Sequence, residues 1–134
     1  MRAVARLAGG KLVQEVTIRG HELTADEPKD EGGDDEGPSP QELLAASLAS
    51  CTAITMEMYA QRKGWDIGSL EVECDYEPAA RGYSTFFNLT LRLPGQLTDE
   101  QRRRLEEIAA SCPVHRTLDG PVRFKQRVES ITNA

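Results

Sequence analysis

The sequence lacks the features that mark several functional classes. It has no excess of basic charge, since 16 Lys and Arg stand against 22 Asp and Glu and the formal net charge is -6. Proteins that bind nucleic acid or anionic membrane surfaces usually carry a basic patch, so we expect neither partner. No long apolar run lies in the first residues, MRAVARLAGGK. We therefore predict no secretion signal and a cytoplasmic location.

Cysteine is also scarce. The chain has three cysteines, Cys51, Cys74 and Cys112, an odd number with wide spacing. Without a secretion signal, such a set does not predict a structural disulfide framework. A zinc site made of Cys51, Cys112 and His115 is an alternative, but the chain lacks the paired Cys-x-x-Cys motifs that indicate zinc. We expect no metal and no bound cofactor.

The chain also has no internal repeat. Its 134 residues, 39% hydrophobic and 28% charged, predict a single globular domain over residues 1–134. Alternating residues at 3–8 and 11–19 around Gly9-Gly10 predict a hairpin, followed by a strand at 21–25. The next segment, DEPKDEGGDDEGPSP, predicts a solvated loop that is either a mobile connector or a lid over a site.

A long helix is predicted from Pro40 to Lys63. Ser39 and Glu42 have the Ser-x-x-Glu spacing of a capping box, Pro40 suits the first helical position, and Gly64 is suited to end the helix. Glu42 therefore has a structural role before any catalytic one is considered.

Apolar positions recur along this helix at helical spacing. The stripe consists of Leu44, Leu48, Cys51, Thr55 and Met58. Other apolar residues cover much of the remaining circumference. We therefore predict a central helix that packs on a sheet on one side and on a partner on another, as in a homodimer.

The second half alternates strands and helices. We predict strands at 69–76 and 85–93, a helix from the Thr98 capping box to about residue 111, a helical turn at 114–118 and a last strand at 122–128. Alternation along the first of these strands places Cys74 on its inward face as a structural residue. This order of elements predicts an α+β fold with a largely antiparallel sheet.

Two cysteines have settings that suit chemistry. Cys112 precedes Pro113 in SCPVHRTL, so its sulfur can lie at a helix N-terminus, where free amides stabilise a thiolate. His115 and Arg116 can add positive charge there. Cys51 lies mid-helix with no cation beside it in the sequence. The two cysteines suit a pair that cycles between dithiol and disulfide, and two inert cysteines remain an alternative.

Two segments carry a resemblance to a known family. GPSPQELLAASLASCTAITMEMYAQRKGW and the later CPVHRTL resemble the OsmC/Ohr family of osmotically inducible and organic-hydroperoxide-resistance proteins, and HELTADEP resembles one OsmC-like subgroup. The resemblance implies an intertwined homodimer in which an antiparallel sheet wraps around the long helix. It also implies a thiol peroxidase that reduces organic hydroperoxides, with active sites at the subunit interface.

The same resemblance assigns roles to residues. It implies that Cys51 attacks the peroxide, that Cys112 closes the disulfide, and that a dithiol, lipoyl groups among them, regenerates the enzyme. Family members place a Glu ten positions before the peroxidatic cysteine, where it helps to hold an Arg over the thiolate. That position is Gln41 here, with Glu42 beside it. Gln41 lies nearer the Cys51 face of the helix than Glu42 does.

Three further expectations concern the pocket. Arg19 is the candidate for the activating cation, and His21 has a similar claim. Leu48 and Thr55, which flank Cys51 on the helix, are expected to contact an apolar substrate together with His21. The rival hypothesis from another class is a dimer of the same fold that binds a small apolar ligand without catalysis.

Overall fold

The computed structural model describes residues 1–131, and its N-terminal part is a three-stranded antiparallel sheet. The strands are β1 (Val4–Leu7), β2 (Gln14–Ile18) and β3 (His21–Ala25), in the order β1-β2-β3. The β2–β3 turn has positive φ at Arg19 (48°) and Gly20 (83°). A two-residue turn with both φ values positive matches the right-handed twist of the strands it joins.

The acidic segment after β3 is folded around one carboxylate. Asp26 is only 2% exposed, and its carboxylate accepts hydrogen bonds from the amides of Glu27 (2.8 Å), Asp34 (3.2 Å) and Glu36 (3.1 Å). A short 3-10 helix, η1 (Lys29–Glu31), lies inside the loop. The segment is therefore an organised loop rather than an unstructured connector.

Helix α1 (Pro40–Lys63) follows the predicted boundaries. The Ser39 hydroxyl accepts the Glu42 amide at 3.1 Å, and Glu42 accepts the Ser39 amide at 2.9 Å, so both bonds of the capping box are present. Gly64 ends the helix in the left-handed conformation with φ of 72°. These local signals are confirmed because they depend only on neighbouring residues.

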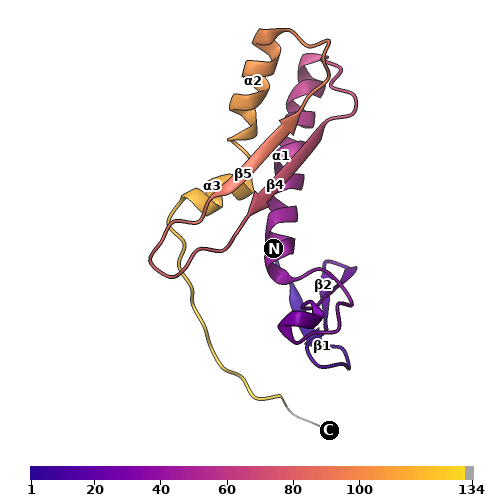
Figure 1. Cartoon of the computed structure of the whole chain (residues 1–134), viewed down its shortest axis with the longest axis vertical. Helices are drawn as coiled ribbons and strands as arrows, with labels where there is room; N and C mark the ends of the chain where they lie inside the picture. The colour runs from indigo at the N-terminus through magenta and orange to yellow at the C-terminus, as the bar shows by residue number, and fades with distance from the viewer. Residues whose placement is uncertain (132–134) are drawn as a thin grey trace.

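The second half of the chain adds two strands and two helices. β4 (Glu71–Tyr76) pairs antiparallel with β5 (Phe87–Arg92), and α2 (Asp99–Ala109) begins with a second capping box. α3 (Pro113–Asp119) follows directly. β4, α2 and α3 all pack against α1 (Figure 1). The fold is α+β with antiparallel sheets around a long central helix, but the 24-residue helix separates the strands into two sheets rather than one.

The core lies around the C-terminal half of α1. Leu105 on α2 and Met56 on α1 are fully buried there. The remaining members of the cluster are Tyr59, Ala60, Ile67, Leu97 and Ala109. The buried face of α1 thus differs in part from the predicted stripe, since Leu48 is buried but Leu44 and Met58 are 37% and 56% exposed. α1 turns its buried face toward β4 and the two short helices, which leaves the other side uncovered.

Helix α1 is also long and apolar enough to cross a membrane by length and composition, with a mean hydropathy of 1.3 in its most apolar window. The core helix of a soluble protein passes the same test. Because α1 packs against β4, α2 and α3, we interpret it as such a core helix. Only 22% of that window is buried in the single chain, however.

The predicted last strand, 122–128, is absent from the described residues of this chain. Residues 121–131 have no assigned helix or strand, and Figure 1 shows them in yellow, running away from the body. A strand needs a neighbouring strand with which to exchange hydrogen bonds, and this segment meets none here. Its apolar side chains are therefore exposed to solvent, Phe124 by 87% and Val128 by 98%.

Candidate active site

The fold brings together two thiols that are far apart in the sequence. Cys51 lies in the middle of α1, and Cys112 is the N-cap residue of α3, which packs against α1. Both cysteines are free, and their sulfurs share a hydrogen bond. Pro113 starts α3 immediately after Cys112, so the chain turn that ends α2 also fixes the position of this sulfur.

Cys112 is fully buried among hydrogen-bond donors. Its sulfur accepts the His115 amide at 3.3 Å, and the Val114 amide and the Thr52 side chain lie close enough to influence its pKa. Burial by itself would raise the pKa of this thiol. The hydrogen bonds from Cys51, the His115 amide, Thr52 and the Val114 amide outweigh burial and lower the Cys112 pKa.

Cys51 is half-buried and less well supplied with donors. Burial raises its pKa, and the hydrogen bond and charge of Cys112 raise it further. The Val114 amide and the Thr55 side chain act in the opposite direction but do not reverse the shift. The two thiols therefore have opposite pKa shifts within one chain.

The expected cation does not lie beside Cys51 in this chain. Arg19 and His21 are both exposed in the β2–β3 hairpin, which belongs to the sheet at the N-terminal end of α1 (Figure 1). Across residues 1–131, no hydrogen bond or ion pair joins either residue to Cys51, and neither contributes to its pKa shift. Residues 1–131 of a single chain thus leave Cys51 without the activating cation that the resemblance implies.

Gln41 and Glu42 occupy the first turn of α1. The Glu42 carboxylate caps the helix, and the amide and hydroxyl of Ser39 lower its pKa. The Gln41 carbonyl accepts a hydrogen bond from the Tyr76 hydroxyl at 3.0 Å. At 1.5 Å per residue, both lie roughly 15 Å along the helix from Cys51. Their role in catalysis stays a prediction.

An apolar cavity of about 250 Å³ lies between α1, β5 and α3. Leu48 lines it from α1, His115 and Leu118 line it from α3, and Phe86 and Phe87 supply aromatic surface. Thr55 is instead hydrogen-bonded to Cys51. That Leu48 and Thr55 contact substrate stays a prediction.

Sequence reasoning missed Thr52, which is fully buried and donates its hydroxyl to the Leu48 carbonyl at 2.8 Å. A signal existed, because Thr52 is a polar residue one turn after Leu48 on the buried face. The position of Cys112 before Pro113 had predicted free helix amides beside its sulfur, and the His115 amide is one of them.

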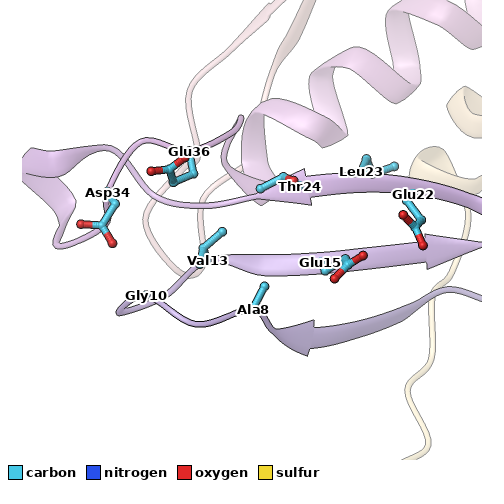
Figure 2. A pocket seen from close by; sticks show the side chains of 9 residues that line it. All are labelled: Ala8, Gly10, Val13, Glu15, Glu22, Leu23, Thr24, Asp34 and Glu36. Carbon is cyan, nitrogen blue, oxygen red and sulfur yellow. The ribbon is translucent and has the colours of Figure 1, made fainter.

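A second cavity is lined by several acidic side chains. This cavity of about 570 Å³ lies at the N-terminal sheet, and Figure 2 labels Glu15, Glu22, Asp34 and Glu36 among the residues that line it. It contains no cysteine and lies against β2 and β3 rather than beside α3. No group of three or more His, Cys, Asp and Glu side chains is arranged to hold a metal ion anywhere in residues 1–131.

Comparison with known proteins matches the chain to a protein family and to a bacterial relative. A family model described as OsmC-like protein matches residues 33–127. A protein of Acinetobacter baylyi described only as uncharacterised is 29% identical over 89 residues, which span 64% of this chain and 62% of that protein. The chain therefore spans less than two thirds of this relative.

Solved structures share the fold. A candidate osmotic stress induced and detoxification response protein from Psychrobacter arcticus matches with a TM-score of 0.75 and 26% identity over 85% of each chain. An organic hydroperoxide resistance protein from Legionella pneumophila matches with a TM-score of 0.65 and 19% identity over 90% of each chain.

Proposed function

Because this chain belongs to the OsmC-like family, we propose that it is a thiol peroxidase that reduces organic hydroperoxides. The observation that carries the proposal is the pair of free thiols, Cys51 and Cys112, hydrogen-bonded across α1 and α3. The name of the Legionella relative, a hydroperoxide resistance protein, supports the same substrate class.

In the proposed reaction, the sulfur of Cys51 attacks the outer oxygen of the hydroperoxide, and the oxygen–oxygen bond breaks. Cys51 becomes a sulfenic acid, and the alkoxide leaves as an alcohol after it gains a proton. Cys112 then attacks the oxidised sulfur, and water is released as the disulfide forms. A dithiol, of which lipoyl groups are one kind, reduces the disulfide and restores both thiols. The apolar side chains around the pair favour an alkyl or aryl hydroperoxide over hydrogen peroxide.

The active form is proposed to be a homodimer. The chain exposes 10679 Å² of surface, whereas a compact monomer of its mass exposes about 7,000 Å². The extended C-terminal segment accounts for part of the excess, and the outer face of α1 for another part, with Ile54 58% and Met58 56% exposed. A second copy would cover both.

The dimer would also complete the site. Cys51 lies on the less buried side of α1, close in sequence to the exposed Ile54. A second copy seated on this side could bring its own Arg19 or His21 to Cys51, which residues 1–131 of one chain do not do. The family's placement of active sites at the subunit interface supports this arrangement.

Titration with cumene hydroperoxide tests the function. The wild type should consume one equivalent and lose two thiols, and Cys51→Ser should abolish turnover with a dithiol reductant. Cys74→Ser is the matched control, because Cys74 lies on β4 and contributes to the pKa shift of neither thiol of the pair, so its loss should affect stability rather than chemistry. Peroxidase activity retained in Cys51→Ser would contradict the proposal, and a wild type that consumes no peroxide would favour a binding role for the same dimer.

A further inference from the structure

We propose that the chain has a second ligand site, separate from the thiol pair, which binds a small organic oxyanion on a flat apolar body, such as an aryl phosphate or carboxylate. The site is a cavity of about 480 Å³ between the C-terminal end of α1 and the N-terminal end of α2, which lie at the same end of the molecule (Figure 1). Cavities of this size are typical of small-molecule sites. Neither cysteine of the pair lines it, so this inference goes beyond the proposed function and does not depend on it.

Basic side chains gather around the ring of Tyr59 in this cavity. The charged groups of Arg62, Lys63 and Arg104 lie 6.0, 5.6 and 5.4 Å from its centroid. The ring attracts each cation, and the negative end of the α1 dipole favours the two that belong to α1. The like charges still repel one another, and a bound anion would offset that repulsion. Within residues 1–131, neither Arg62 nor Lys63 forms an ion pair.

The charge of the cavity stays positive when its carboxylates are counted. Three basic side chains line it, with Glu100 as the acidic one. Glu107 pairs with Arg103 at 3.2 Å and with Arg104 at 2.9 Å, each through a single nitrogen. A guanidinium has five N–H donors, so both arginines keep donors for a second anion. The lining therefore retains positive charge in a chain whose formal net charge is -6.

The neutral polar side chains of the cavity also present donors. The Tyr59 hydroxyl oxygen accepts from Arg104 Nε at 3.0 Å. The Gln101 side-chain oxygen accepts the Thr98 amide at 2.9 Å, and the Thr98 hydroxyl accepts the Gln101 amide at 3.1 Å. Their oxygens are thus used within the fold, while within residues 1–131 their own O–H and N–H groups donate to no acceptor. Converging donors with a positive charge fit an oxyanion.

Trp65 supplies a flat apolar wall beside these donors. Its ring and that of Tyr59 meet edge to face, with centroids 5.6 Å apart. Trp65 is half-buried and lines the cavity, so part of its indole is open to a ligand. An aromatic surface next to anion-binding donors favours an oxyanion that carries a flat apolar group over a bare inorganic ion.

Fluorescence of Trp65, the single tryptophan of the chain, can report binding directly. The probe is phenyl phosphate, compared with inorganic phosphate and with neutral benzyl alcohol. We expect phenyl phosphate to bind saturably and more tightly than inorganic phosphate, and added salt to weaken it because charge contributes to its affinity. Benzoate as a further probe shows which oxyanion is preferred. Benzyl alcohol that binds as tightly as phenyl phosphate, or no saturable signal with either aryl oxyanion, would overturn the proposal.

Two substitutions test the assigned donors. Tyr59→Phe keeps the ring and removes the hydroxyl, and should raise the dissociation constant of phenyl phosphate about ten-fold, the size of one hydrogen bond to a charged group. Lys63→Gln should raise it about five-fold, as expected for one exposed ion pair. Lys29→Gln is the matched control, because it removes the same charge from an exposed position on η1 and should leave binding unchanged.

Circular dichroism checks that each variant is folded, and the exposed Lys63 provides a test that is independent of the buried Tyr59. Equal effects of Lys63→Gln and Lys29→Gln would show general charge screening and overturn the site. So would an unchanged dissociation constant in folded Tyr59→Phe.

These outcomes are separable from the proposed function. Cys51→Ser should bind phenyl phosphate as the wild type does, and Lys63→Gln should consume hydroperoxide as the wild type does. A protein that binds phenyl phosphate without consuming hydroperoxide would retain this site and contradict the peroxidase. A peroxidase that does not bind either aryl oxyanion would overturn this site alone.

Discussion

Cys51 and Cys112 differ in what surrounds each sulfur, although both are part of one hydrogen-bonded pair. Cys112 is fully buried and accepts the His115 amide, while Cys51 is half-buried. The two thiols thus differ in how far solvent and substrate can reach them. The more accessible sulfur suits reaction with a substrate, and the buried one suits disulfide closure.

Substitution of Cys112 by Ser should separate these two roles. We expect peroxide to oxidise Cys51 once, after which no second thiol closes the disulfide and excess peroxide carries the sulfenic acid to the sulfinic acid. Mass spectrometry of the intact protein should show the added oxygens, and turnover with a dithiol should stop after one cycle. Sustained turnover in this variant, with the Cys74→Ser control active, would contradict the resolving role.

Part of this site could be predicted from the sequence, and part could not. The place of Cys112 before a helix-starting proline indicated a sulfur among free amides, and the structure shows the His115 amide bonded to it. The contact between Cys112 and Cys51 depends on the packing of α3 against α1, which spacing alone does not encode. The resemblance supplied that pairing, and neither source indicated Thr52.

At the scale of elements, the acidic loop depends on one buried carboxylate more than on any apolar contact. The Asp26 carboxylate accepts hydrogen bonds from three backbone amides of the segment, and the Asp26 amide donates to the Pro38 carbonyl at 3.1 Å. Gly33 lies so close to the Glu27 carbonyl that a Cβ atom would clash with it. The composition predicted a loop here, but the fold of the loop comes from contacts that composition does not reveal.

Asp26→Asn should loosen this loop and destabilise the protein in a pH-dependent way. Burial acts to raise the Asp26 pKa, but the amides of Glu36, Glu27 and Asp34 outweigh it and lower the pKa. A lowered pKa means that the carboxylate stabilises the fold fully above the ordinary Asp value of about 3.9, and that this contribution is lost as the pH falls through the lowered pKa. Urea unfolding should therefore separate wild type and variant at neutral pH and bring them together in strong acid.

The matched control is Asp30→Asn, in the same loop but exposed on η1. It should leave the urea midpoint nearly unchanged at every pH, since surface substitutions usually have small effects. If Asp26→Asn and Asp30→Asn behave alike, the Asp26 carboxylate is not the feature that organises the loop.

At the scale of the whole molecule, the chain exposes apolar side chains that a second copy would bury. The residues predicted to form the last strand have alternating apolar side chains but no partner strand within the described part of the chain. The sequence favoured a strand because the alternation is present, and the single chain cannot form it because pairing needs a second strand. The same reasoning applies to α1, because its own chain leaves apolar side chains on one side of the helix exposed to solvent.

A charge on the uncovered face of α1 should therefore weaken the dimer and the activity together. Ile54→Glu places a carboxylate at a position that is 58% exposed in one chain and that we propose to be buried between two. An unpaired charge buried in an interface costs several kcal/mol, so the dissociation constant should rise by about a hundred-fold or more. Ser69→Glu is the matched control, because it adds the same charge at an exposed position outside α1. Sedimentation at micromolar concentration should show dimers for the wild type and Ser69→Glu and monomers for Ile54→Glu. Hydroperoxide consumption should fall in step with the loss of dimer if a second copy completes the site. A wild type that sediments as a stable folded monomer, or a monomeric Ile54→Glu with full activity, would show that one chain suffices.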